Sequence, residues 1–218
     1  MNCLPYDLPN RLAQRLSRAD LPGGRVQRRM APDMAMGRHR GPVSPGVHRA
    51  AVCICLVWHS DDWWLPLTLR AHQVADHANQ VSLPGGRLEG NEGPAAAARR
   101  EFQEELGCSL DAAERLGQLS SLYVFGSHHH VDVFVHAIHD RPTFRPNPDE
   151  VAEVLWMPVR DLLDADQEVI ATMQRGTSKF DAPGFRCQNH VIWGATAMIL
   201  AEFAEIVRQC LVEEKVAS

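Results

Sequence analysis

The glutamates at positions 101, 104 and 105 are the side chains whose spacing most clearly suggests chemistry. They lie in the run REFQEELG, residues 100–107. On a helix, positions i, i+3 and i+4 share one face, so Glu101, Glu104 and Glu105 would converge on one side. Like charges at this spacing destabilise a bare helix by roughly a few tenths of a kcal/mol per pair. A hard divalent cation would neutralise them, because Mg²⁺ and Mn²⁺ prefer carboxylate oxygens.

These glutamates belong to a longer pattern, GRLEGNEGPAAAARREFQEELGC. In it, Gly86 and Glu92 precede the acidic run at fixed spacings. The pattern resembles the Nudix box, G-x5-E-x7-R-E-U-x-E-E-x-G-U, in which U is a bulky apolar residue. Only Cys108, a small hydrophobe at the last position, is a loose fit. A solvated acidic helix face is the competing interpretation for the glutamates alone, but the register of Gly86, Glu92, Arg100 and Gly107 favours the box.

The resemblance implies metal-assisted attack of water on phosphorus, with Mg²⁺ or Mn²⁺ as the cofactor. It implies that Glu101 and Glu105 are metal ligands. Glu104 is implied as a third ligand or as a contributor to water activation. A backbone carbonyl of Gly85 or Gly86 would complete the ligand set, since glycines let the backbone approach without a Cβ in the way.

The resemblance places Glu92 and Arg100 in a supporting shell around the metal ligands. The general base of this family often lies outside the box. Glu150 and Glu153, in the run DEVAEV, are the candidates here. Surface carboxylates are the alternative interpretation, because glutamate is mostly exposed. The residues to which we assign catalytic roles are Glu104, Glu105 and Glu150.

The residues before the box resemble the coenzyme A pyrophosphatase branch of the family, whose signature is L-L-T-x-R-[SA]-x3-R-x3-G-x3-F-P-G-G. The segment PLTLRAHQVADHANQVSLPGG keeps that spacing. Pro66, Ala75, Asn79 and Leu83 depart from the expected residue types. The runs VLWMPVRDLLD and VIWGATA resemble later segments of the branch. Arg70 would then contact phosphate or substrate, while a strand-end ion pair with a surface carboxylate is its alternative role.

The branch resemblance implies hydrolysis of coenzyme A or acyl-CoA to 3′,5′-ADP and 4′-phosphopantetheine or its acyl form. Other nucleoside diphosphates, namely ADP-ribose, NADH or a dinucleoside polyphosphate, are the alternative substrates. A non-catalytic domain that only senses a nucleotide is the alternative of a different class. Such domains commonly lose box glutamates, whereas all are present here.

The elements expected to position these residues give an α+β fold, a Nudix-type α/β/α sandwich with a mixed sheet. The helix over residues 94–106 is the clearest, because Pro94 suits a first turn and Gly107 a C-cap. A short helix is expected from Pro158. The other expected helices are 8–19 and 190–213, and the expected strands are 49–58, 63–69, 81–83, 118–125, 131–138 and 151–157.

Two regions are expected in the chain of 218 residues: an N-terminal extension over 1–47, with a short helix and a loop, and a Nudix hydrolase domain over 48–218. The net charge of −5 argues against a nucleic-acid polymer as partner. We therefore expect a small nucleotide-derived substrate, and a homodimer is left open. The absence of a signal peptide or a long apolar run indicates a cytoplasmic protein with no membrane partner.

Neighbouring cysteine, histidine and tryptophan residues could have structural or metal-binding roles outside this motif. Cys53 and Cys55 alternate in an apolar run, which favours burial in a strand over metal binding. The three histidines at 128–130 cannot easily share one ion if they are adjacent strand residues. One of them could reach the diphosphate cleft, and an exposed polar loop is the preferred interpretation. Of Trp63 and Trp64, alternation should bury one and expose the other.

Overall fold

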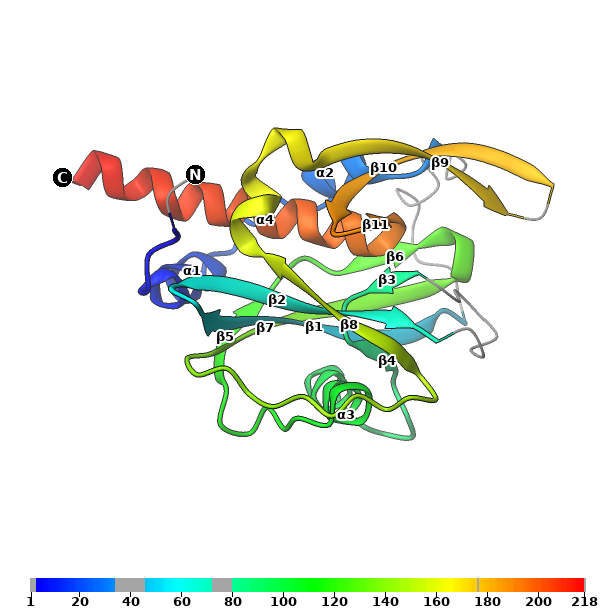
Figure 1. Cartoon of the computed structure of the whole chain (residues 1–218), viewed down its shortest axis with the longest axis horizontal. Coiled ribbons are helices and arrows are strands. Elements are labelled where there is room, and N and C mark those ends of the chain that lie inside the picture. Colours follow the sequence, from blue (N-terminus) through cyan, green and yellow to red (C-terminus); the bar gives the residue numbers. More distant parts are fainter. Residues whose placement is uncertain (1–2, 34–45, 72–79, 176, 218) are drawn as a thin grey trace.

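The middle layer of the protein is a mixed β-sheet with helices on both of its faces (Figure 1). The computed structural model describes residues 3–33, 46–71, 80–175 and 177–217. The predicted α+β class, with a mixed sheet between helices, is confirmed. The strands of this sheet are β1 (His48–His59), β2 (Asp62–Arg70), β3 (Val81–Ser82), β4 (Gly85–Arg87), β5 (Glu114–Gln118), β6 (Leu122–Val124), β7 (His129–Ile138) and β8 (Val151–Pro158).

Strand β1 is the centre of this sheet. It pairs with β2 and β4 in antiparallel fashion and with β7 in parallel fashion. Residues 53–56 are at most 1% exposed, so both faces of the strand are covered. A strand that is buried on both faces is apolar at every position, which is how the run AVCICLVW reads. The predicted burial of Cys53 and Cys55 is confirmed.

Helix α3 (Pro94–Leu106) covers one face of the sheet, and its predicted bounds are confirmed. Phe102 and Leu106 pack against Cys53 and Cys55 of β1. Gly107 ends the helix with φ +62°, a left-handed conformation that suits glycine at a C-cap. The apolar positions of α3 therefore hold the acidic positions at a fixed place beside the sheet.

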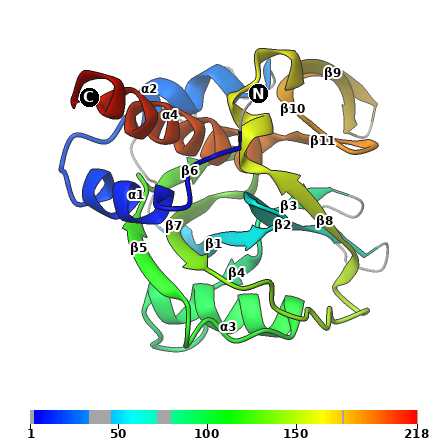
Figure 2. The same cartoon turned by 60° about the vertical axis from the view of Figure 1, so that its left-hand side comes forward.

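Helices α1 (Leu8–Leu16) and α4 (Gly194–Ala217) lie on the opposite face (Figure 2). Leu8, Leu12 and Leu16 of α1 are buried in the core that α4 also lines, which confirms the amphipathic helix predicted there. The predicted helix ran to residue 19, whereas α1 ends at Leu16. No helix of the described residues is long and apolar enough to cross a membrane.

Buried carboxylates attach the N-terminal residues to the rest of the chain. Asp62 accepts a hydrogen bond from the backbone N–H of Leu4 at 3.2 Å. Glu202 of α4 is fully buried and accepts hydrogen bonds from the N–H of Gly23 and from Gln27 Nε2, at 3.0 and 2.8 Å. The segment predicted as loop after residue 20 contains the short helices α2 (Gly24–Gln27) and η1 (Arg28–Met30).

A second sheet of three strands extends beside α4 (Figure 1). Its strands are β9 (Glu168–Arg175), β10 (Ser178–Cys187) and β11 (His190–Trp193). Neither β9 nor β10 was predicted from the sequence. Strand β10 carries Pro183 although it is the central strand, and proline there removes a ladder donor. The predicted helix start at residue 190 is wrong, because residues 190–193 pair with β10 and Gly194 turns into α4 at φ +65°.

The strand predicted over 118–125 is only partly confirmed, because β6 lies within it but two separate strands occur in this region. Strand β5 ends at Gln118 and β6 begins at Leu122, and both pair with β7. The pairing shifts its register between Arg115 and Gly117, a local irregularity that a period-two pattern does not reveal. Further 3₁₀ segments of the described residues are η4 (Phe125–Ser127), η5 (Val159–Leu163), which occupies the predicted short helix after Pro158, and η6 (Ala165–Gln167).

Candidate active site

The backbone of Gly85 and Gly86 lies directly against the acidic face of α3. A Cβ added at Gly86 would overlap the carboxylate of Glu101. A Cβ at Gly85 would overlap backbone atoms of Ala51, and its φ of +148° favours glycine. The N–H of Gly85 donates to Glu105 Oε2 at 3.3 Å. Only glycines allow this approach, so the turn and the helix form one unit.

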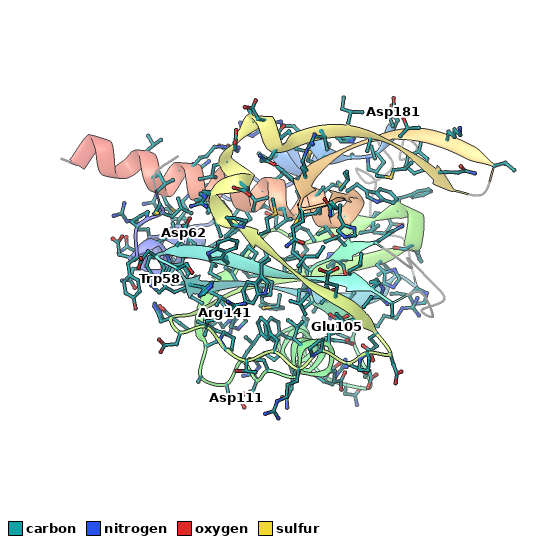
Figure 3. The ribbon with its side chains drawn as sticks, in the orientation of Figure 1. Trp58, Asp62, Glu105, Asp111, Arg141 and Asp181 are labelled. Carbon is teal, nitrogen blue, oxygen red and sulfur yellow. The ribbon has the colours of Figure 1, made fainter. Side chains whose placement is uncertain are left out.

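Glu105 lies where α3 meets the sheet (Figure 3) and is only 3% exposed. Burial raises its pKa to about 8, against the opposing effects of Arg70 and the Gly85 N–H. Arg70 Nη1 lies 3.7 Å from its Oε1. Glu101 and Glu150 add negative charge that raises the pKa further. A carboxylate held in such surroundings is costly without a nearby cation.

Glu101 and Glu104 differ in their surroundings although both lie on α3. Glu101 is mostly buried, and burial raises its pKa in spite of the hydrogen bond from Arg100. Glu104 is 51% exposed, and its contact is Arg100 Nη1 at 2.7 Å. The predicted convergence therefore gathers Glu101 and Glu105 toward the Gly85–Gly86 turn, while Glu104 lies at the solvent side.

Arg100 connects the loop before α3 to the helix carboxylates. Its Nε and Nη2 donate to Glu92 at 3.2 and 2.8 Å, and its Nη1 donates to Glu101 at 3.0 Å. Glu92 also accepts from the backbone N–H of Glu89 at 2.7 Å. The Arg100 hydrogen bond is the main reason that the pKa of Glu92 lies below its usual value. Arg100 and Glu92 thus orient the carboxylate of Glu101.

Glu150 is a third carboxylate of this group, supplied by the turn before β8. Its charge raises the pKa of both Glu101 and Glu105. Asn147 Nδ2 donates to Glu150 Oε1 at 3.3 Å, and the backbone N–H of Asn147 donates to the carbonyl of Glu105 at 3.0 Å. The other candidate, Glu153, is exposed on β8 and its charge acts on Cys187 instead.

Asn147 contacts this carboxylate group and was not predicted from the sequence. It holds the turn carrying Glu150 against the end of α3, through the contacts just described, and its carbonyl accepts from the N–H of Val151 at 2.8 Å. The only sequence signal was its place between two prolines in RPNPDE, a turn composition. That composition predicts a bend without predicting which helix the bend contacts.

Arg70, at the end of β2, is brought to the same site by an irregularity in the sheet. The β2–β8 pairing shifts its register between Leu69 and Arg70. Its Nη1 faces Glu105, so the ion pair of the alternative interpretation is present, but with a buried carboxylate in place of a surface one. Its Nε is buried and has no hydrogen-bond partner among the described residues. Two other positions of that signature, Ala75 and Asn79, lie outside the described residues.

The donor set fits a hard divalent cation. Glu101, Glu105 and Glu150 offer carboxylate oxygens from two segments; the charge of Glu150 raises the pKa of Glu101 and of Glu105, and the charge of Glu101 raises the pKa of Glu105. A cation among them would remove the repulsion that burial intensifies. The described part of the chain contains no group of three His, Cys, Asp or Glu side chains already close enough to hold an ion.

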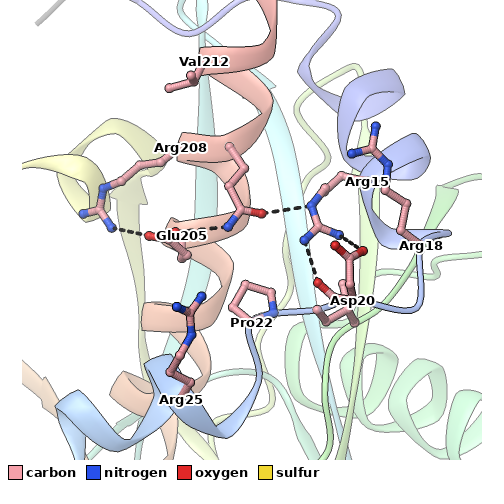
Figure 4. A pocket seen from close by; sticks show the side chains of 10 residues that line it. Arg15, Arg18, Asp20, Pro22, Arg25, Glu205, Arg208 and Val212 are labelled. Carbon is pink, nitrogen blue, oxygen red and sulfur yellow. Dashed lines mark hydrogen bonds and ion pairs between the residues drawn. The ribbon is translucent and has the colours of Figure 1, made fainter.

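A hollow of about 600 Å³ between α1 and α4 shares no residue with this carboxylate group (Figure 4). Buried Arg15 donates to Gln209 Oε1 at 2.9 Å and to the carbonyl of Asp20 at 2.8 Å. Arg208 on its other side donates to the carbonyl of Leu162 at 3.1 Å. Both arginines therefore donate hydrogen bonds to other groups of the chain. The residues around the hollow connect the N-terminal extension to α4.

The three histidines at 128–130 do not form a common site. His128 has a left-handed conformation, with φ +55°, and its Nδ1 lies 3.0 Å from the hydroxyl of Tyr123. His129 and His130 begin β7 and are half-buried, so the predicted exposed loop is wrong. Trp63 is fully buried and Trp64 is half-buried, close to the predicted alternation.

Comparison with known proteins gives a consistent result. Residues 47–175 match the family model described as NUDIX domain. The chain is 31% identical over 168 residues to "Uncharacterized Nudix hydrolase NudL" of Yersinia enterocolitica, covering 77% of this chain and 85% of that protein. It is 33% identical over 185 residues to "Nudix hydrolase 22, chloroplastic" of Arabidopsis thaliana, covering 77% of this chain and 58% of that longer protein.

Among solved structures, a MutT/nudix family protein from Enterococcus faecalis is similar with a TM-score of 0.53 and 16% identity. That similarity covers 95% of this chain and 76% of the other. At this level of identity the similarity concerns the fold.

Proposed function

The chain belongs to the Nudix hydrolase family, and from that premise we propose that it hydrolyses the diphosphate bond of coenzyme A or an acyl-CoA. The products are 3′,5′-ADP and 4′-phosphopantetheine, or the acyl derivative of the latter. In this reaction the oxygen of a water molecule bonds to one phosphorus and the bridging P–O bond breaks. Two phosphate monoesters result, and the water gives up its protons to a base and to the medium.

The main support for this proposal is the contact between Arg70 and Glu105. Arg70 belongs to the segment that resembles the coenzyme A branch, and Glu105 belongs to the box that resembles the catalytic motif. The two lie 3.7 Å apart, although 35 positions separate them in sequence. A guanidinium beside the catalytic carboxylates can bind phosphoryl oxygens through two parallel N–H groups. Its Nε has no hydrogen-bond partner among the described residues, which supports a role in holding substrate.

We propose that Glu101 and Glu105 bind the metal, with Glu104 and the carbonyl of Gly86 as further ligands. The ion is Mg²⁺ or Mn²⁺. When bound, such an ion withdraws charge from the phosphoryl oxygens and promotes ionisation of the attacking water. The chain's own contribution is to orient these ligands: Arg100 fixes Glu101, and the N–H of Gly85 fixes Glu105.

Glu150 is the proposed proton acceptor. It lies near enough to Glu101 and Glu105 to raise the pKa of both, and Asn147 orients it at 3.3 Å. A carboxylate in this position can take a proton from water as the new P–O bond forms. Arg70 meanwhile holds the diphosphate at the end of β2, so the phosphorus, the water and the base are kept in one orientation.

A substrate panel tests the proposal. The full chain with Mg²⁺ is assayed on coenzyme A, acetyl-CoA, ADP-ribose, NADH and a dinucleoside polyphosphate. We expect kcat/KM for coenzyme A or its thioester to exceed that for ADP-ribose by at least about tenfold, a difference of about 1.4 kcal/mol in barrier. If ADP-ribose or a dinucleotide is the better substrate, the coenzyme A assignment is wrong and the family assignment stands.

A further inference from the structure

Arg87 lies one residue beyond the proposed metal-binding turn, on the opposite face of the sheet. In the β4–β1 pairing, Gly86 is opposite Ala51 and Arg87 is opposite Ala50. Ala51 belongs to the cluster that α3 covers, and Ala50 belongs to the core on the α4 face. Because successive strand residues point to opposite faces, Arg87 projects from the face that α3 does not cover.

Two histidines lie on that same face at the ends of the neighbouring strands. His48 of β1 lies two positions before Ala50, so its side chain points to the same face as Arg87. His129 of β7 is paired with His48 and points to that face as well. The rings of His48 and His129 have centroids 5.3 Å apart. Arg87 Nε donates to His129 Nε2 at 2.9 Å, which fixes the plane of the guanidinium. The result is a cluster of three basic side chains beside the metal-binding turn.

Arg87 of this cluster has no carboxylate partner among the described residues. Arg49 and Arg100 nearby each pair with a carboxylate, at 2.9 and 2.8 Å, whereas Arg87 pairs with none in the described part of the chain. Its two Nη atoms make no hydrogen bond to the described residues. An arginine whose Nε is held by its own chain and whose Nη atoms lack partners is preorganised to bind an anion.

We propose that Arg87, oriented by His129 and accompanied by His48, is a subsite for a second phosphate group of the substrate, separate from the diphosphate that is cleaved. The proposal rests on the proposed function and deepens it. The backbone carbonyl of Arg87 is itself held by Arg100 Nη2 at 3.0 Å, so the subsite and the box are rigidly connected. A phosphate on the nucleoside, a few bonds from the scissile bridge, matches this arrangement. The subsite selects nucleotides that carry a 3′-phosphate.

Binding of product nucleotides tests the subsite without turnover. Calorimetry with chelator present compares 3′,5′-ADP with 5′-AMP, which lacks the second phosphate. We expect the wild-type chain to bind 3′,5′-ADP at least about tenfold more tightly, since a charge-assisted hydrogen bond is worth about 1.5–3 kcal/mol. The Arg87→Ala variant should bind the two nucleotides with affinities equal to within about twofold.

A matched control is Arg49→Ala, because Arg49 is the adjacent arginine of β1 with the opposite facing and its own carboxylate, Asp132. This variant should keep the preference for 3′,5′-ADP. His129→Leu should lose part of the preference, and His129→Gln should restore it, because glutamine can still accept from Arg87 Nε. Rescue by glutamine distinguishes orientation of Arg87 from a general loss of structure.

Kinetics separate this inference from the proposed function. If coenzyme A is hydrolysed, Arg87→Ala should raise KM for coenzyme A by about tenfold and leave KM for 3′-dephospho-coenzyme A nearly unchanged. An equal rise for both substrates would assign Arg87 to the scissile diphosphate and overturn the subsite. Equal binding of 3′,5′-ADP and 5′-AMP by the wild-type chain would also overturn it. Failure to hydrolyse either coenzyme refutes the proposed function, while the calorimetry still decides the subsite.

Discussion

Replacing Glu105 by glutamine should stabilise the metal-free protein while it abolishes metal binding. The carboxylate is 3% exposed and its pKa is raised to about 8, mainly by burial. Each pKa unit corresponds to about 1.4 kcal/mol, so ionised Glu105 lowers the free energy of unfolding by roughly 5 kcal/mol relative to the protonated form. Glutamine keeps the shape and an acceptor for the Gly85 N–H, but it leaves Arg70 without its partner.

The lost contact with Arg70 reduces the expected gain to about 1–3 kcal/mol, which corresponds to a rise in Tm of roughly 2–12 °C for a chain of this size. The sign depends on pH. Because the folded pKa lies above the unfolded one, the stability from protonated Glu105 is complete below pH 4.5 and is lost as the pH rises through about 8. In chelator, the wild-type Tm should therefore fall between pH 5 and pH 9 more steeply than that of Glu105→Gln.

Calorimetry in chelator and in Mg²⁺, with turnover measured on the same samples, is the assay. At pH 8.5 Mg²⁺ should raise the wild-type Tm and leave that of Glu105→Gln unchanged, because only the ionised carboxylate binds the ion. Glu104→Gln is the control for stability, since Glu104 is half exposed and its charge is not buried. A lower Tm for Glu105→Gln in chelator at pH 8.5, with an unchanged response to Mg²⁺, would refute the reasoning.

Three further changes have defined outcomes. Glu101→Gln should lower kcat at least about a hundredfold with an intact fold, by circular dichroism, since the amide loses the charge that holds the ion; near wild-type turnover contradicts the ligand assignment. Arg70→Ala should raise KM by about tenfold or more, because a charge-assisted hydrogen bond to phosphate is worth about 1.5–3 kcal/mol; a fall in Tm alone would make Arg70 structural. Asn147→Ala should lower kcat more than it raises KM, because Glu150 loses its orienting donor at 3.3 Å; an unchanged kcat removes Glu150 from the mechanism.

The parts of the site that depend on local spacing could be predicted from the sequence. Helix α3 is bounded by Pro94 and Gly107 as expected, since helix caps are encoded within one turn of the chain. The turn at Gly85 and Gly86 was recognised by composition, and the structure gives the reason: any Cβ there would collide with backbone or with Glu101.

The parts that depend on tertiary contacts could not be predicted. Which of Glu150 and Glu153 lies near the α3 carboxylates depends on how the turn at Asn147 packs on the end of α3, which no periodicity encodes. Arg70 reaches Glu105 through a register shift in the β2–β8 pairing. Strand β10 could not be predicted because proline, here Pro183, is rarely found in a central strand. In each case a contact distant in sequence overrides the local pattern.

The proposed cleavage is tested most directly by identifying the products of coenzyme A. The full chain is incubated with coenzyme A and Mg²⁺, and the mixture is resolved by chromatography with mass detection. We expect 3′,5′-ADP and 4′-phosphopantetheine in equal amounts, and neither when chelator replaces Mg²⁺, because the carboxylates of α3 act through the ion. Coenzyme A that stays intact while ADP-ribose is cleaved, or product formation that is unaffected by chelator, would contradict this account.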